Sequence, residues 1–403
     1  MITVIDSLMG SGKSSWFRQA IAGDNTRNFL YIAYRLKDIE EQKQSIEAEG
    51  IIRDISEPQN KGNGKLDNIV NLISQQRDIM STHELFRRFD GRCYEALKEN
   101  SYTLVIDEAI EAVRQYSFSG RDDYKYLLNN GDITVDENGK ISWTGSDLST
   151  RFDDVRILAQ NDALFTVDGK YYLWHYPHRF FDVFDQVYIL TYNFNGTLLK
   201  YYFDLYNIPY EMKSIGEGQN GYEIIDYVEH PDLAQVRSRI DVYQDAPLLD
   251  NISQKHNALS ARWFDYAGNR NAIACLRNNM YNYTRNIIGA QSSEVMWTCY
   301  ERQRGKLKGN GYAKGWLPFN IKGSNEYQGR NCLMYAVNYY MQPEMEKFFT
   351  ARGISIDKDQ VALTELLQWV WRSNIRDKSS DKQVHVYIPS SRMRTLFTNW
   401  LTA

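Results

Sequence analysis

Short apolar runs alternate with amphipathic segments through the first quarter of the chain. The runs are rich in β-branched and aromatic residues, and they lie at 2–5, 28–34, 50–55, 78–83 and 102–109. Such runs are typical of buried parallel strands. The segments between them have helical spacing and lie at 14–22, 35–49, 66–76 and 84–100. This alternation predicts an α/β fold with a parallel sheet and crossover helices.

The alternation stops at about residue 115 and resumes at about residue 185. Within this stretch, two alternating segments at 132–143 and 163–174 contain the turn pairs Asn138-Gly139 and Asp168-Gly169. Asn-Gly and Asp-Gly between alternating runs are typical of β-hairpins. We interpret residues 115–185 as a hairpin insertion in the first domain. The strand expected at 187–191 then returns to the sheet.

A second α/β pattern fills the rest of the chain. Apolar strands are expected at 222–228, 294–298, 332–337 and 384–388, with helices at 258–288, 344–351, 358–373 and 390–401. A chain of 403 residues is long for one α/β unit,. With a linker at 209–221, the sequence predicts two domains, 1–213 and 214–403.

Composition narrows the class of protein. Hydrophobic residues make up 43% and charged residues 24%, as in soluble globular proteins,. A formal net charge of −4 excludes a uniformly basic surface but not a local basic groove,. The four cysteines show no paired spacing, which argues against a zinc site or a disulfide framework,. Without a long apolar run or signal pattern, we expect no membrane contact and a cytoplasmic location.

A turn of small residues separates the first apolar run from the first helical segment. It reads Ser7-Leu8-Met9-Gly10-Ser11-Gly12-Lys13-Ser14. The glycines let backbone N–H groups point at phosphate oxygens, and the following helix adds its positive dipole end. Lys13 would reach the β- and γ-phosphates, and the Ser14 hydroxyl would ligate Mg²⁺. The predicted nucleotide-binding residues are Met9, Gly10, Ser11, Gly12, Lys13, Ser14 and Ser15.

Asp107 and Glu108 end the apolar run at 102–109. A carboxylate there can hold Mg²⁺, and its neighbour can orient and deprotonate an attacking water. The pair therefore favours hydrolysis over phosphoryl transfer to a small acceptor. The polar residues that close the later strand, at 190–193, are candidates for sensing the γ-phosphate.

The segment 368–376 carries a third constellation. Gln368, Arg372 and Arg376 recur at intervals of four and would share one face of a helix,. Arginines placed in this way can stabilise transition-state charge on a γ-phosphate. An amphipathic helix with solvated arginines is the alternative interpretation.

Together these motifs resemble those of superfamily 2 helicases and translocases with two RecA-like domains, most closely small DEAD/DEAH-like helicases encoded by bacteriophages. Motif I corresponds to 9–14, motif II to 107–109 and motif VI to 368–376, where Trp371 replaces a usual glycine and the arginine spacing is four. This departure leaves the choice of arginine finger, Arg372 or Arg376, open. The weaker motifs correspond to 34–35 (Ia), 81–83 (Ib), 190–193 (III), 298 (IV) and 322–327 (V).

The resemblance implies an ATP- and Mg²⁺-dependent motor in which hydrolysis at the domain interface drives movement on single-stranded or forked DNA, with RNA as another candidate. The implied catalytic residues are Lys13, Asp107, Glu108, Gln368, Arg372 and Arg376, with Ser14 and Asp107 as metal ligands and Gly323 as a further ATP contact. The implied nucleic-acid contacts are Arg35, Thr82, His83, Thr298, Lys322 and Asn325. It further implies a monomer in a bacterial host cytoplasm, with replication or recombination proteins as candidate partners.

Two other functions stay open at this point. A nucleic-acid-stimulated ATPase could act as a switch or loader without unwinding. A P-loop kinase for a small molecule is the third hypothesis, which the Asp-Glu pair and the second α/β half disfavour.

Overall fold

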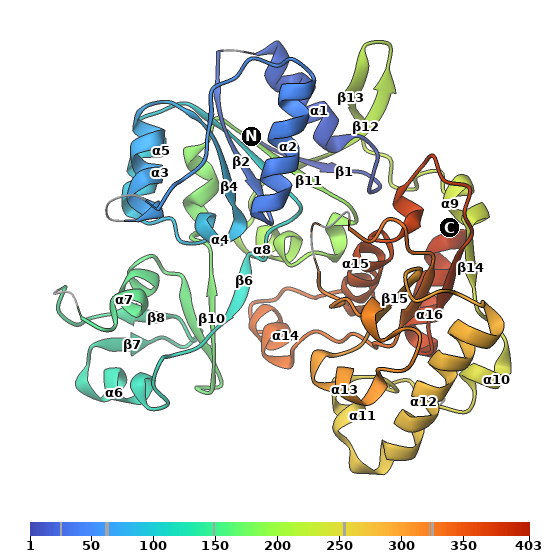
Figure 1. Ribbon diagram of the computed structural model, residues 1–403. Helices are drawn as coiled ribbons and strands as arrows, with labels where there is room; N and C mark the ends of the chain where they lie inside the picture. Colours follow the sequence, from blue (N-terminus) through green and yellow to red (C-terminus); the bar gives the residue numbers. More distant parts are fainter. Residues whose placement is uncertain (25, 61–63, 148–149, 253–254, 322, 324–325) are drawn as a thin grey trace. The chain divides into compact units, whose positions relative to one another are not determined.

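The computed structural model describes residues 1–24, 26–60, 64–147, 150–252, 255–321, 323 and 326–403 (Figure 1). These residues form two compact units. The first comprises Met1–Tyr227 together with Gln342–Ile356, and the second comprises Val228–Met341 together with Asp357–Ala403. The short segment Gln342–Ile356 thus belongs to the first unit although both of its ends continue into the second.

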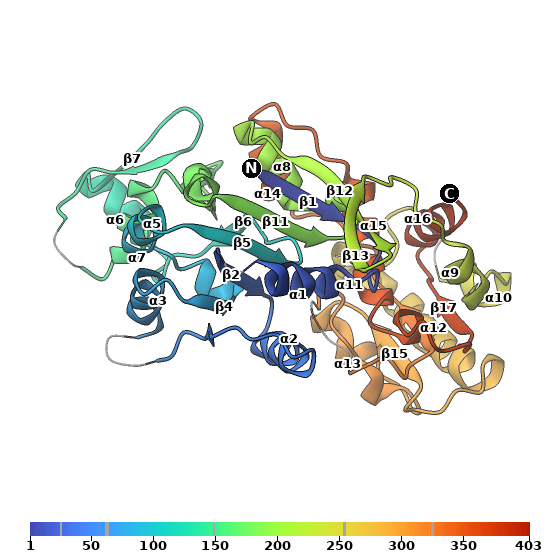
Figure 2. The same ribbon diagram turned by 90° about the horizontal axis from the view of Figure 1, so that it is seen from above.

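The first unit is built on an eight-stranded sheet of order β13-β12-β1-β11-β5-β2-β4-β3 (Figure 2). Its strands are β1 (Ile2–Asp6), β2 (Asn28–Ala33), β3 (Ile55–Ser56), β4 (Asp78–Thr82), β5 (Tyr102–Asp107), β11 (Gln186–Thr191), β12 (Glu211–Gly218) and β13 (Gly221–Asp226). Neighbouring strands are parallel except β12 and β13. The predicted parallel sheet is therefore confirmed.

Helices connect these strands as the sequence predicts. The helices of the first unit are α1 (Lys13–Gly23), α2 (Leu36–Ala48), α3 (Lys65–Ser74), α4 (His83–Phe86), α5 (Gly91–Lys98), α6 (Asp123–Asn130), α7 (Asp153–Gln160), α8 (Leu198–Tyr206) and α14 (Pro343–Thr350). Helix α1 buries Trp16 and Phe17 on one face of the sheet, where Phe17 stacks on Tyr31 of β2 with ring centroids 4.6 Å apart. This apolar packing fixes the start of α1 relative to the strand ends.

The predicted insertion contains the two expected hairpins. Strands β7 (Ile133–Val135) and β8 (Ile141–Trp143) pair with each other, while β9 (Leu164–Val167) and β10 (Tyr171–His175) join β6 (Val113–Tyr116) in the order β6-β10-β9. Asp168 and Gly169 have φ of 57° and 63°, as the two central residues of a type I′ turn require,. Helix α14 packs on β9 through Phe348 and Phe165, whose ring centroids are 5.3 Å apart.

The first unit extends past residue 213, where the sequence analysis placed its end. The expected linker at 209–221 contains β12, which pairs in parallel with β1, and β13 continues the ribbon. Without β12, β1 would be an edge strand with unpaired backbone groups. The ribbon thus completes the first sheet and does not open the second.

The second unit has a parallel four-stranded sheet of order β14-β17-β16-β15. Its strands are β14 (Ile240–Val242), β15 (Val295–Thr298), β16 (Cys332–Tyr335) and β17 (Val384–Tyr387). Its helices are α9 (Ala234–Arg239), α10 (Ala246–Leu249), α11 (Ala261–Asp265), α12 (Arg270–Asn282), α13 (Arg304–Leu307), α15 (Lys358–Val370) and α16 (Ser391–Thr402). Across the described residues, no helix combines the length and apolarity that a bilayer span requires.

The predicted helix through residue 373 ends earlier, so Gln368, Arg372 and Arg376 do not share one helical face. Helix α15 stops at Val370, and Arg376 lies in a separate 3₁₀ turn, Asn374–Arg376. The Ser373 hydroxyl donates to the Val370 carbonyl at 2.6 Å and accepts from the Ile375 N–H at 3.4 Å. Such local bonds compete with helical hydrogen bonding and explain the early stop.

Candidate active site

The turn between β1 and α1 has backbone features that suit a phosphate-binding loop. Gly10 and Gly12 have φ of 81° and 99°, a region that other residues rarely adopt,. Gly12 precedes the first residue of α1, so the turn opens directly into a helix N-terminus,. The Lys13 ammonium donates to the carbonyl oxygens of Ser7 and Leu8, the latter at 3.1 Å. It therefore lies along the inner wall of the loop.

One strand separates this loop from the predicted Asp-Glu pair. Strand β11 lies between β1 and β5, with Asp6 opposite Thr191 and Leu190 opposite Asp107. Because all three strands run in the same direction, their carboxyl ends meet at one edge of the sheet, where α/β folds bind ligands. The fold thus brings the loop, Thr191 and Asp107 together.

Asp107 is a half-buried acid at this edge. Its carboxylate accepts a hydrogen bond from the Tyr31 hydroxyl at 2.8 Å. Burial first, and then the neighbouring Glu108 carboxylate, raise the pKa of Asp107 to about 6, while the Tyr31 hydrogen bond opposes this rise,. Tyr31 is a site residue that the sequence analysis treated only as part of a strand.

Glu108 has a strained backbone. Its φ is 73°, in the left-handed region that disfavours residues with a Cβ, and its N–H donates to the Leu190 carbonyl at 2.9 Å,. Such conformations cost about 1–3 kcal/mol and are concentrated at functional sites. The bond to β11 holds Glu108 in a sharp turn directly beyond Asp107.

Two further side chains belong to the same edge. The Asp6 carboxylate accepts hydrogen bonds from the backbone N–H groups of Asn193 and Phe194, at 2.7 and 2.9 Å, and so ties the end of β1 to the turn after β11. The Thr191 hydroxyl is buried and has no hydrogen-bond partner among the described residues. A buried polar group without a partner is costly and suggests a ligand or water at that position.

The donors at this edge suit Mg²⁺. Within the described part of the chain, no three His, Cys, Asp or Glu side chains gather closely enough to hold a metal ion by themselves. Mg²⁺ commonly binds through one or two protein oxygens, with substrate phosphates and waters completing its shell. The Asp107 carboxylate and the Ser14 hydroxyl at the start of α1 fit this pattern.

The predicted nucleic-acid contacts fall into three groups. Arg35 pairs with Asp38 at 3.0 Å, the Thr82 hydroxyl caps α4, and the His83 Nε2–H donates to the Asp107 carbonyl oxygen at 3.1 Å. Thr298 is fully buried at the end of β15. Lys322 and Asn325 lie outside the described residues, whereas their neighbour Gly323 is described, with φ of 54°.

The candidate residues of the second unit differ in exposure. Gln368 and Arg372 have relative exposures of 6% and 3%, whereas Arg376 is partly exposed. The Asn374 and Asp377 carbonyls on either side of Arg376 accept hydrogen bonds from buried Arg239, both at 2.8 Å. This clamp fixes the backbone of the turn that carries Arg376.

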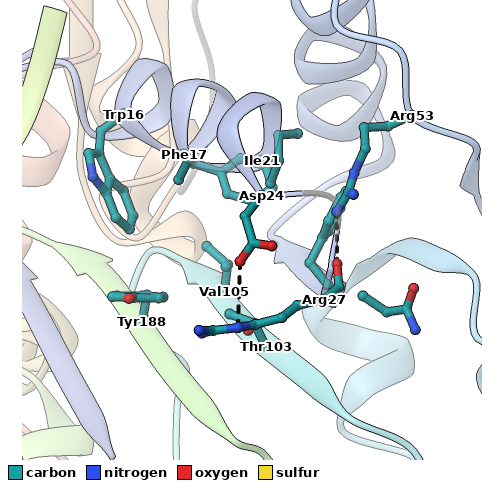
Figure 3. Close-up of a pocket in the computed structure, with 12 residues that line it drawn as sticks. Trp16, Phe17, Ile21, Asp24, Arg27, Arg53, Thr103, Val105 and Tyr188 are labelled. Carbon is teal, nitrogen blue, oxygen red and sulfur yellow. Dashed lines mark hydrogen bonds and ion pairs between the residues drawn. The ribbon is translucent and has the colours of Figure 1, made fainter.

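A small cavity also lies beneath α1. Trp16, Phe17 and Ile21 point from the helix into it, and Arg27 lies beside Asp24 at its margin (Figure 3). Its volume is about 100 Å³. Ligand pockets commonly measure about 300–1,000 Å³, so this cavity is too small for a nucleotide. The strand ends beside the loop at Gly10–Lys13 are the better candidate site.

Comparison with known proteins identifies the family. The SPbeta prophage-derived uncharacterized protein YonV of Bacillus subtilis (strain 168) is 32% identical over 413 residues, covering 99% of this chain and 98% of that protein. The chain belongs to the YonV family. The YonV middle domain matches residues 113–174, and the YonV C-terminal Rossmann-like domain matches residues 234–401. The middle domain thus coincides with the hairpin insertion.

Solved structures show the fold. Xpd4 of S. tokodaii has a TM-score of 0.53 and 12% identity, covering 99% of this chain and 93% of that chain. A structure described as an XPD helicase has a TM-score of 0.48 and 10% identity, covering 100% of this chain and 95% of that chain. The Xpd4 match and the parallel sheets of both units confirm the predicted fold class, two RecA-like domains. The narrower DEAD/DEAH-like assignment has no such support.

Proposed function

We propose that this protein is an ATP hydrolase of the helicase or translocase type, which couples turnover to movement on single-stranded DNA. The observation that carries this proposal is the meeting of the phosphate-binding loop and the Asp107–Glu108 pair at one sheet edge, with only β11 between them. The helicase class is supported by the fold that the chain shares with Xpd4.

Each residue has a defined chemical task in this proposal. Backbone N–H groups of the loop and Lys13 neutralise the phosphates, while Ser14 and Asp107 hold Mg²⁺, which when bound neutralises charge on the phosphate oxygens. Glu108 orients the attacking water and accepts its proton. Four assignments rest on the sequence alone: Gly323, Gln368, Arg372 and Arg376. Of the two arginines, Arg376 is favoured as the arginine finger because its side chain is partly exposed.

Nucleic-acid binding is proposed for the strand ends next to this site. The His83 imidazole donates a hydrogen bond to the Asp107 carbonyl oxygen, so a displacement of His83 would also displace the backbone of Asp107. Arg35, Thr82 and His83 are retained as candidate contacts, and Lys322 and Asn325 as sequence-based ones. Buried Thr298 is left out because a side chain without exposure offers no surface for a phosphate backbone.

ATP turnover by the purified full chain tests the proposal. Lys13→Ala should abolish ATP binding and turnover, whereas Glu108→Gln should abolish turnover and retain binding. Single-stranded DNA or RNA should stimulate the wild-type protein, and a forked duplex should be unwound. Full turnover in either variant would refute the site assignment.

The two alternative functions predict different results in these assays. If nucleic acid stimulates turnover but the forked duplex stays intact, the protein is a switch or loader. A P-loop kinase would instead transfer the γ-phosphate of ATP to a small-molecule acceptor, without any response to nucleic acid. The two RecA-like domains disfavour this alternative.

A further inference from the structure

The β12–β13 ribbon extends past the sheet edge beside the phosphate-binding loop. Ile5 is opposite Lys213, so residues from Ile215 onward run beyond the end of β1. The Ile215 N–H donates to the Ser7 hydroxyl at 2.8 Å, and the Ser214 hydroxyl donates to the Asp6 carbonyl at 3.0 Å. These two bonds fix the ribbon against the first residues of the loop (Figure 1).

The ribbon places an aromatic ring directly on the loop. Tyr222, the second residue of strand β13, lies so close to Gly12 that a Cβ added to Gly12 would be 2.2 Å from the ring Cε1. The Tyr222 N–H donates to the Gln19 side-chain oxygen of α1 at 2.9 Å. The ring is half-buried and packs against the apolar cluster that contains Ile5, Trp16 and Phe17. Part of the ring therefore remains accessible next to the start of α1.

The order of the strands gives a direction to a bound nucleotide. Asp107 and Glu108 follow β5, which lies on one side of β1, whereas the ribbon lies on the other side. In the proposed reaction the γ-phosphate must face Asp107 and Glu108, because hydrolysis occurs there. The α-phosphate and the nucleoside then extend toward the ribbon.

We propose that Tyr222 forms the nucleoside-binding wall of the phosphate-binding loop, with the base of a nucleoside triphosphate packed on its ring. This inference rests on the proposed function and adds the base-binding side of that site. Gln19 is a positioning residue, since its hydrogen bond to the Tyr222 backbone holds the ring at the helix start. Because every base has a π-face, stacking of this kind tolerates different bases.

The test compares two ligands that share the phosphates and differ in the nucleoside. Binding of ATP and of inorganic tripolyphosphate, each with Mg²⁺, is measured by calorimetry on the full chain. Tyr222→Ala should weaken ATP binding about tenfold or more and leave tripolyphosphate binding unchanged. Tyr222→Phe should retain ATP affinity. Tyr171→Ala, which removes an exposed tyrosine of β10, is the matched control and should change neither.

Each outcome separates the two proposals. Unchanged ATP affinity in Tyr222→Ala, or an equal loss for both ligands, would overturn the role of the ring. Tyr222→Leu keeps an apolar side chain against Gly12 and replaces the alanine variant if that variant does not fold. Lys13→Ala should bind neither ligand. If the wild-type protein binds ATP no more tightly than tripolyphosphate, this inference alone is refuted. If the wild type binds neither ligand, the proposed function fails as well.

Discussion

Replacing Tyr31 with phenylalanine tests how Asp107 is kept ionised. The Tyr31 hydroxyl donates to the Asp107 carboxylate at 2.8 Å; Tyr31 is buried and Asp107 is half-buried. The hydrogen bond favours the charged form of the acid, which burial and Glu108 otherwise disfavour,. Tyr31→Phe removes only this donor, because the ring that stacks on Phe17 remains.

The expected size of the effect follows from the kind of hydrogen bond. A bond to a charged group contributes about 1.5–3 kcal/mol. One pKa unit corresponds to about 1.36 kcal/mol, so the pKa of Asp107 should rise from about 6 by roughly one to two units,. At pH 7 a large share of the variant would then carry a neutral Asp107, which is a poor ligand for Mg²⁺.

The assay is the pH dependence of kcat/KM for ATP hydrolysis, which reports the ionisation of the free enzyme. Turnover of the wild type should fall as pH drops through about 6, and the variant should show the same fall at higher pH. Tyr102→Phe is the matched control, since its buried hydroxyl donates to the Arg77 carbonyl at 2.7 Å, at the start of β5. A folded Tyr31→Phe variant with an unshifted acid limb would refute the reasoning.

Four further substitutions have defined outcomes. Gly12→Ala should abolish nucleotide binding and lower Tm, since its φ of 99° and the Tyr222 ring both exclude a Cβ; normal binding by calorimetry would contradict this. Burial lowers the pKa of His175 to about 4, so between pH 6.5 and 4 the unfolded state binds more protons than the folded state,. The free energy of unfolding should therefore fall by up to about 3 kcal/mol as the pH is lowered from 6.5 to 4,. Urea unfolding should show a smaller fall in His175→Gln, and an equal fall would refute it. Arg376→Ala should lower turnover at least about tenfold at unchanged ATP affinity and Tm, whereas Arg372→Ala should lower Tm because Arg372 is buried.

The parts of the fold that local patterns determine could be predicted from the sequence. The loop at Gly10–Lys13 and the strand ending in Asp107 each carry their signal within about ten residues, and the hairpins carry theirs in one turn pair. Each of these features follows from backbone preferences of glycine, asparagine and β-branched residues.

The parts that depend on distant partners could not be predicted. Strand β12 joins the sheet because β1, about 200 residues earlier in the sequence, has a free edge,. No local sequence pattern indicates this pairing. Tyr31 and Tyr222 look like ordinary strand tyrosines until the fold sets them beside Asp107 and Gly12. The stop of α15 at Val370 is a competition between a serine hydroxyl and the helix, which apolar spacing does not reveal,.

The middle domain of this family is attached to the site through the backbone itself. Its first strand, β6, begins at Val113, five residues after Glu108, and the chain returns through β11 to Thr191. The Ala112 carbonyl accepts from the Tyr176 N–H at 3.2 Å, so the two connections are joined where they enter and leave the domain. The outgoing connection starts at the end of β5 that carries Asp107, whereas the returning chain enters β11 at Gln186, the end of that strand opposite Thr191. The backbone between Glu108 and Val113 is therefore the direct covalent link between the insertion and the candidate site.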